Sequence, residues 1–116
     1  MLTWKSLTDM AQVDTIREEE SYHVPCLIFK HSTRCSISTT AKARLERTWQ
    51  LAPHHVHTYY LDLLNHRPIS NHIVETFGVQ HESPQVLLII KGECVYDESH
   101  NAISANDILT EVQQNN

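Results

Sequence analysis

The chain has 116 residues, of which 41% are hydrophobic and 20% charged, a composition that predicts one folded domain (residues 1–116) and excludes global disorder. Nine Lys and Arg stand against fourteen Asp and Glu, and this net charge of −5 argues against nucleic-acid binding, which needs clustered cations. The longest apolar run, residues 86–90, is far shorter than the roughly twenty residues of a membrane-spanning helix, so we expect no membrane partner.

Residues 1–9 lack both the basic start and the apolar stretch of a signal peptide. We therefore expect a cytoplasmic protein, in a compartment where thiols are kept reduced. The three cysteines, Cys26, Cys35 and Cys94, are accordingly predicted to be free thiols rather than a disulfide framework.

The N-terminal residues predict an extended lead followed by a helix. Residues 2–7 form the lead, and Thr8 can cap a helix that runs to about Glu20. The helix carries an imperfect apolar stripe made of Met10, Val13, Ile16 and Arg17.

Residues 24–45 hold the pattern around which the rest of the chain is organised. Residues 26–29 are a short apolar run, which is typical of a strand buried on both faces in a parallel sheet. After a polar loop, apolar residues spaced by four predict a helix that is closed by Pro53; they are Ile37, Ala41, Leu45 and Trp49. Cys35 therefore lies where a strand passes into a helix.

Residues 55–63 are rich in β-forming residues and predict a second strand. Because a helix joins it to the first strand, the two should lie parallel in one sheet. Pro68 then opens another helix, Gly78 ends it, and residues 79–83 form a loop. The apolar face of this helix consists of Ile69, Ile73, Val74 and Phe77.

The last third of the chain predicts a β-hairpin and a final helix. Residues 86–90 and 94–96 are the two hairpin strands, with residues 91–93 as the turn. Ser104 and Asp107 form a capping box that starts a helix along Ile108, Leu109 and Val112. The complete order predicts an α/β fold, with a four-stranded mixed β-sheet flanked by helices on both faces.

The setting of Cys35 favours a thiolate, which is the species that attacks a disulfide. N–H groups at a helix N-terminus are unpaired and carry partial positive charge, and Arg34 adds a fixed charge. Thr33, Ser36 and Ser38 supply hydroxyl groups that can donate hydrogen bonds to the sulfur. A buried, inert cysteine is the usual alternative, but the polar flanks of Cys35 disfavour it.

The element order, with a cysteine at the first strand-to-helix turn and a proline before the third strand, resembles the thioredoxin fold. Four segments resemble the monothiol bacilliredoxin (YtxJ-like) family over nearly the whole chain; they are FKHSTRCSIS (29–38), RPISN (67–71), GVQHESPQ (78–85) and Ser99-His100. The resemblance implies an enzyme that removes bacillithiol, a low-molecular-weight thiol, from S-thiolated proteins. It also implies that Cys35 is the attacking thiol and that Pro84 is a cis-proline facing it.

The residue three positions after Cys35 is Ser38, which cannot form a disulfide, so the predicted mechanism is monothiol. Cys35 attacks the sulfur of the small thiol, a protein thiolate leaves, and a second small thiol regenerates Cys35. We expect a low-molecular-weight thiol such as bacillithiol as cosubstrate, with no metal or other cofactor. A dithiol enzyme that uses Cys26 or Cys94 as the resolving cysteine is the first alternative, although both residues fit structural roles better.

Ser83, Pro84, Ser99 and His100 are predicted to bind substrate. A cis Ser83–Pro84 bond would expose the Ser83 backbone to the bound disulfide, whereas an ordinary loop or edge-strand proline is the alternative. Ser99 and His100, with Asn101, follow the last strand just before a helix N-terminus, a place that suits the carboxylates of a small thiol. A plain polar turn explains them equally well.

The histidines raise the alternative of a metal site. His54, His55 and His57 are close in sequence, and residues two apart on a strand share a face. No third or fourth ligand follows nearby, so solvated histidines are the preferred interpretation. A non-enzymatic binding module or metal carrier of thioredoxin fold is the second alternative. His31 and His81 flank the two loops of the site, where they either tune the thiolate or are ordinary polar residues.

Overall fold

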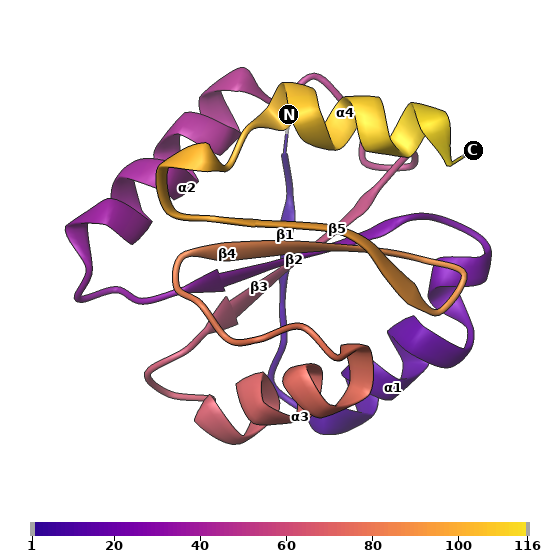
Figure 1. Cartoon of the computed structure of the whole chain (residues 1–116), viewed down its shortest axis with the longest axis horizontal. Coiled ribbons are helices and arrows are strands. Elements are labelled where there is room, and N and C mark those ends of the chain that lie inside the picture. The colour runs from indigo at the N-terminus through magenta and orange to yellow at the C-terminus, as the bar shows by residue number, and fades with distance from the viewer. Residues whose placement is uncertain (1, 116) are drawn as a thin grey trace.

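The computed structural model describes residues 2–115, which form a five-stranded mixed sheet with helices on both faces (Figure 1). The strands are β1 (Trp4–Ser6), β2 (Cys26–His31), β3 (His57–Asp62), β4 (Gln85–Ile90) and β5 (Glu93–Ser99). The helices are α1 (Met10–Glu18), α2 (Ser36–Thr48), α3 (Arg67–Phe77) and α4 (Ala105–Gln114), with short 3-10 turns at Glu20–Tyr22 and His100–Ala102. The predicted α/β fold is confirmed, but the sheet has one strand more than predicted.

The additional strand is β1, which lies within the segment that we predicted as an extended lead. Its three residues pair in parallel with residues 58–60 of β3, so β1 forms one edge of the sheet, in the order β1-β3-β2-β4-β5. A strand of three residues is too short to show an alternating pattern, and its partner lies more than fifty residues away. The sequence pattern therefore could not reveal it.

Strand β2 is the centre of the sheet. It pairs in parallel with β3 and antiparallel with β4, and all six of its residues are buried, which confirms the predicted βαβ unit. Lys30 lies opposite Gln85, and Gln85 in turn lies opposite Ser99 at the end of β5. The carboxyl ends of β2, β3 and β5 and the amino end of β4 thus meet at one edge of the sheet.

Two apolar cores lie on the two faces of the sheet (Figure 1). Helices α2 and α4 cover one face, where Phe29 and Leu45 are buried. Helices α1 and α3 cover the other face, where Ile28 and Ile73 are fully buried. Because side chains alternate along a strand, successive residues of β2 enter opposite cores.

Some predicted details of the helices are wrong. Asp9, not Thr8, caps α1, because its carboxylate accepts the Ala11 N–H while the Gln12 side chain accepts the Asp9 N–H. Met10 and Ile37, assigned to buried stripes, are 42% and 46% exposed. Both lie in the first turn of a helix, where the sheet offers less surface to cover them.

The predicted end of α3 and start of α4 agree with the structure, whereas the second hairpin strand spans Glu93–Ser99 and is longer than the predicted residues 94–96. Gly78 ends α3 with a left-handed φ of 71°, and Ser104 accepts the Asp107 N–H at the start of α4. Lys91 and Gly92 both have positive φ, as a two-residue hairpin turn requires. Glu93 therefore begins β5 and is not part of the turn.

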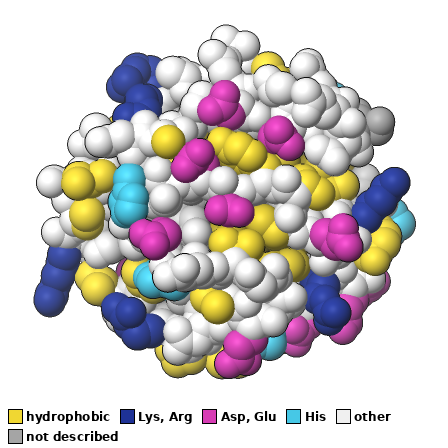
Figure 2. Space-filling view, in the orientation of Figure 1, with side chains coloured by type: hydrophobic (Ala, Val, Ile, Leu, Met, Phe, Trp, Pro, Cys, Tyr) yellow, Lys and Arg dark blue, Asp and Glu magenta, His cyan; other side chains and the backbone are white. Residues whose placement is uncertain are grey.

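Charged side chains are dispersed on the face of the molecule seen in Figure 2. Lys and Arg lie around its rim, and several Asp and Glu lie near its centre. This distribution fits the expectation that nucleic acid is not a partner, which stays a prediction. Within residues 2–115, no helix combines the length and apolar character needed to cross a membrane.

Candidate functional site

Cys35 is the residue that caps the start of α2, and its side chain is partly exposed. Its N–H donates to the Ser32 carbonyl oxygen at 3.1 Å, and its carbonyl oxygen accepts from the Thr39 N–H at 3.1 Å and from Thr39 Oγ1 at 3.3 Å. These bonds fix the Cys35 backbone between the loop and the first turn of the helix. The thiol is thus held at the strand-to-helix turn, as predicted from the sequence.

Cys35 occupies the N-cap position of α2 through its backbone, and its neighbours in sequence are polar. In the described part of the chain, the Cys35 side chain makes no capping hydrogen bond to α2. Thr33, Arg34 and Ser36 all have exposed side chains in the same segment. They are free to approach the sulfur or a bound ligand, and their role in stabilising a thiolate stays a prediction.

Ser38 is fully buried and joins the end of β2 to α2. Its Oγ lies 2.6 Å from His31 Nδ1 and accepts the Ser32 N–H at 3.1 Å. Burial, followed by the nearby Lys42 charge, lowers the pKa of His31, so the ring is neutral and Nδ1 can accept the Ser38 hydroxyl proton. The Ser38 hydroxyl is therefore satisfied beneath the loop that carries Cys35, while its predicted donation to the sulfur stays untested.

Ser38→Ala should lower the free energy of unfolding by about 1–3 kcal/mol, because it leaves the Ser32 N–H and His31 Nδ1 without this partner in a buried place. Urea unfolding followed by circular dichroism measures the change. Ser36→Ala, which removes an exposed hydroxyl from the same turn, is the matched control and should change stability by less than about 0.5 kcal/mol. Equal losses in the two variants would contradict the importance of the buried network.

The second loop of the site contains a cis peptide bond between Ser83 and Pro84, which agrees with what the family resemblance implied. Pro84 is buried, and its carbonyl oxygen accepts the His100 N–H at 3.0 Å. His100 Nε2 lies 3.6 Å from the Glu82 carboxylate. The loop before β4 and the turn after β5 are thus joined to each other.

The sheet register brings the two loops to the same edge. Lys30 and Gln85 are paired, so Pro84 lies beside the end of β2, from which the Cys35 loop begins. Ser99 pairs with Gln85 on the other side of β4. The structure therefore places all four predicted substrate-binding residues at the sheet edge that carries the Cys35 loop.

Lys30 is a residue at this edge that we did not predict. It is fully buried, and its Nζ lies 3.4 Å from His81 Nδ1. His81 Nδ1 in turn lies 3.3 Å from Ser70 Oγ. Burial lowers the pKa of Lys30 to about 8, and burial together with the Lys30 charge lowers the pKa of His81. None of the ion pairs within residues 2–115 includes Lys30. The sequence feature that could have revealed Lys30 is its position directly after an apolar run that predicts a strand buried on both faces.

Cys26 and Cys94 lie far from the candidate site. Both flank Ile89 of β4, and Cys26 is five residues from His31 along β2, which corresponds to roughly 16 Å. Their thiols donate to the Val24 and Tyr96 carbonyl oxygens, each at 3.3 Å. Burial raises the pKa of Cys94 to about 11 and raises that of Cys26 further, since Glu20 is also near Cys26. At neutral pH both groups are therefore protonated thiols.

The predicted histidine cluster is divided in the structure. His54 and His55 are exposed, and His55 precedes β3, so it shares no strand face with His57. His57 is not a solvated histidine, because its Nδ1 lies 2.5 Å from Glu20 Oε1. Tyr59 also donates to the Glu20 carboxylate. Within residues 2–115, the ligand atoms of Glu20, Cys26 and His57 lie within 4.8 Å of one another, but this carboxylate already has two protein partners.

Comparisons with known proteins identify the family. Residues 5–108 match the family model described as "Monothiol bacilliredoxin BrxC". A solved structure described as an oxidoreductase with a thioredoxin fold is 28% identical, with a TM-score of 0.76 over 93% of this chain and 91% of that one. Thioredoxins of Malassezia sympodialis and Fasciola hepatica are each 12% identical, with TM-scores of 0.72 and 0.70 over 97% of this chain and 90% and 99% of theirs, and they show the fold alone. Since the family model spans most of the sequence and the fold agrees, the chain belongs to the monothiol bacilliredoxin family and is a thioredoxin-fold thiol oxidoreductase.

Proposed function

We propose that this protein is a cytoplasmic monothiol oxidoreductase that uses Cys35 to remove bacillithiol from mixed disulfides on protein cysteines. The observation that carries the proposal is the partly exposed Cys35 at the start of α2, with a serine at position 38 and cis-Pro84 at the same sheet edge. Its partners are S-thiolated proteins and the small thiol itself. No metal or bound cofactor takes part in the proposed steps.

The proposed reaction has two exchange steps. The Cys35 thiolate attacks the bacillithiol sulfur of the mixed disulfide, the bond between the two sulfurs breaks, and the protein cysteine leaves as a thiolate. A second bacillithiol thiolate then attacks the bacillithiol sulfur that is bound to Cys35. This step releases bacillithiol disulfide and restores the Cys35 thiolate, so the protein cysteine is reduced and the incoming bacillithiol is oxidised in its place.

The predicted site residues take distinct roles in this scheme. Arg34, Thr33 and Ser36 stabilise the Cys35 thiolate through charge and hydrogen bonding, while Ser38, whose single hydroxyl proton is given to His31, holds the turn beneath the sulfur. The Ser83 backbone beside Pro84 pairs with the bound disulfide, as an added strand pairs with a sheet edge. Ser99 and His100, at the end of β5, bind carboxylates of the small thiol.

The positions of the other cysteines support a monothiol mechanism over a dithiol one. A resolving cysteine must bring its sulfur to about 2 Å from that of Cys35. Cys26 is fully buried and, like Cys94, lies toward the opposite end of the sheet. Neither cysteine can reach Cys35 without disruption of the strands that carry it.

Mass spectrometry tests the proposal directly. The reduced protein is incubated with bacillithiol disulfide and, separately, with glutathione disulfide, and each cysteine is then examined for an adduct. We expect one bacillithiol on Cys35 and none on Cys26 or Cys94. Adducts on all three cysteines, or no adduct on Cys35, would contradict the proposed mechanism.

A further inference from the structure

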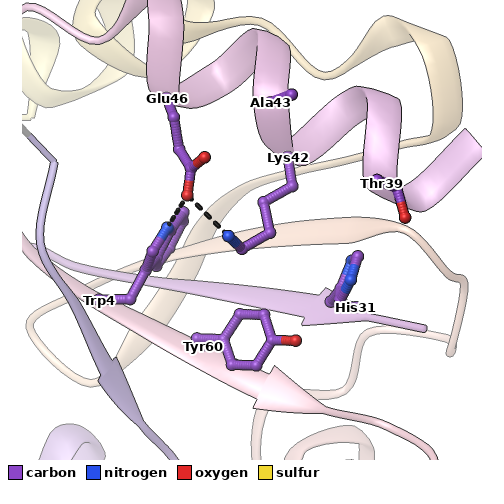
Figure 3. A pocket seen from close by; sticks show the side chains of 7 residues that line it. All are labelled: Trp4, His31, Thr39, Lys42, Ala43, Glu46 and Tyr60. Carbon is purple, nitrogen blue, oxygen red and sulfur yellow. Dashed lines mark hydrogen bonds and ion pairs between the residues drawn. The ribbon is translucent and has the colours of Figure 1, made fainter. Parts of the chain in front are cut away.

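A pocket of about 370 Å³ lies between α2 and the sheet (Figure 3). Its roof is one stripe of α2, made of Thr39, Lys42, Ala43 and Glu46. Its floor consists of the rings of Trp4, Tyr60 and His31, which come from the neighbouring strands β1, β3 and β2. The volume lies within the range of about 300–1,000 Å³ that small-molecule sites occupy.

Cys35 stands at the head of the helix stripe that roofs the pocket. Positions 39, 42, 43 and 46 lie on one face of α2, and Cys35 precedes the first turn of this helix as its N-cap residue. At about 1.5 Å per residue, Thr39 lies roughly 6 Å and Lys42 roughly 10 Å along the helix axis from Cys35. Thr39 also bonds to the Cys35 carbonyl oxygen at 3.3 Å. The pocket therefore begins about one helical turn from Cys35, within reach of a small thiol bound to it.

The charged groups of the pocket neutralise each other. Lys42 Nζ lies 2.7 Å from Glu46 Oε2, and the same oxygen accepts the Trp4 indole N–H at 2.7 Å (Figure 3). Lys42 Nζ also lies 5.5 Å from the centroid of the Tyr60 ring. With no net charge, the pocket offers donors and acceptors to the uncharged hydroxyl groups of a ligand.

The floor of the pocket combines aromatic faces with the hydroxyl group of Tyr60. The Tyr60 ring centroid lies 6.4 Å from that of Trp4 and 5.4 Å from that of His31. In Figure 3 the Tyr60 hydroxyl points away from Trp4, and no dashed line joins it to another residue drawn. Burial, with the charge of Asp62, raises the pKa of Tyr60 and keeps this hydroxyl neutral.

We propose that this pocket binds the sugar ring of a low-molecular-weight thiol whose sulfur is joined to Cys35. The C–H faces of a sugar pack on aromatic rings, while its hydroxyl groups bond to Lys42, Glu46 and Tyr60. The inference rests on the proposed function and adds a specificity site to it. Bacillithiol carries a sugar ring, whereas glutathione is a tripeptide, so the pocket selects bacillithiol.

Non-covalent binding tests the pocket without any reaction at sulfur. Cys35→Ser protein is titrated with reduced bacillithiol, and the indole N–H signals of its two tryptophans, Trp4 and Trp49, are followed by NMR. We expect the Trp4 signal to move and the signal of buried Trp49 to stay, with a much smaller response to glutathione. Tyr60→Phe and Lys42→Met should each weaken binding about fivefold, as loss of one hydrogen bond does. Lys91→Met, in the β4–β5 turn, is the matched control and should bind normally.

The ratio of two reaction rates distinguishes the effect of ligand binding in the pocket from the reactivity of the Cys35 sulfur. The rates of adduct formation with bacillithiol disulfide and with 2-hydroxyethyl disulfide, which has no sugar, are measured for each protein. We expect the ratio of the two rates to fall about fivefold in Tyr60→Phe and Lys42→Met and to stay constant in Lys91→Met. A constant ratio in the pocket variants, or an unmoved Trp4 signal, would overturn the inference. Failure of Cys35 to react with either disulfide would overturn the proposed function instead, while the NMR titration still tests the pocket.

Discussion

Cys35→Ser is expected to reduce the removal of bacillithiol from protein mixed disulfides to the uncatalysed rate, a loss of roughly a thousandfold or more. A serine hydroxyl does not ionise near neutral pH and does not attack a disulfide sulfur. Serine is also a favoured residue at the start of a helix, so the variant should fold normally. The loss is measured by mass spectrometry, as the time course of bacillithiol release from an S-bacillithiolated protein.

The other two cysteines provide the controls for this prediction. Cys26→Ala and Cys94→Ala remove thiols that lie toward the opposite end of the sheet from Cys35, so each should retain the rate within about threefold once folding is verified. A folded Cys26→Ala or Cys94→Ala protein that had lost turnover would replace the monothiol mechanism with a dithiol one. A fully active Cys35→Ser protein would remove Cys35 from the mechanism altogether.

Lys30→Met is expected to raise the free energy of unfolding by about 1–3 kcal/mol at pH 7. Burial lowers the pKa of Lys30 to about 8 from its ordinary value of 10.5, a difference that corresponds to roughly 3 kcal/mol of destabilisation of the charged form. Methionine has a similar length and no charge to bury, so it avoids this penalty. Loss of the contact between Lys30 and His81 offsets part of the gain.

The effect of Lys30 on stability should depend on pH. Below about pH 8 the lysine is protonated in both the folded and the unfolded chain, so the whole penalty is present. Between about 8 and 10.5 the folded state has lost the proton and the unfolded chain still binds it, so the wild-type protein becomes more stable as pH rises. The advantage of Lys30→Met should therefore be large at pH 7 and small at pH 10.

Urea unfolding of the wild-type and Lys30→Met proteins at the two pH values measures this difference. Lys91→Met removes an exposed lysine from the β4–β5 turn and serves as the control, with a change below about 0.5 kcal/mol at either pH. A Lys30→Met protein that is less stable than wild type at both pH values would show that the contact with His81 outweighs the buried charge.

Much of the fold and the location of the candidate site could be predicted from local sequence patterns. The apolar run of β2 and the four-residue spacing in α2 placed Cys35 at the turn between them. The motif around Pro84 supported both the cis bond and the family. These features were predictable because strand burial, helix periodicity and turn chemistry are properties of neighbouring residues.

The sequence by itself thus determined the α/β fold, the family and the turn that holds Cys35, since each is encoded within short segments. Only the tertiary structure decided that Trp4 belongs to a strand, that Lys30 is buried against His81, and that Ser38 bonds to His31. It also separated His57 from His54 and His55 by pairing it with Glu20. The physical reason is that these contacts join residues on different elements. A hydrophobic pattern indicates that a side chain is buried, but it does not identify the residue that this side chain contacts.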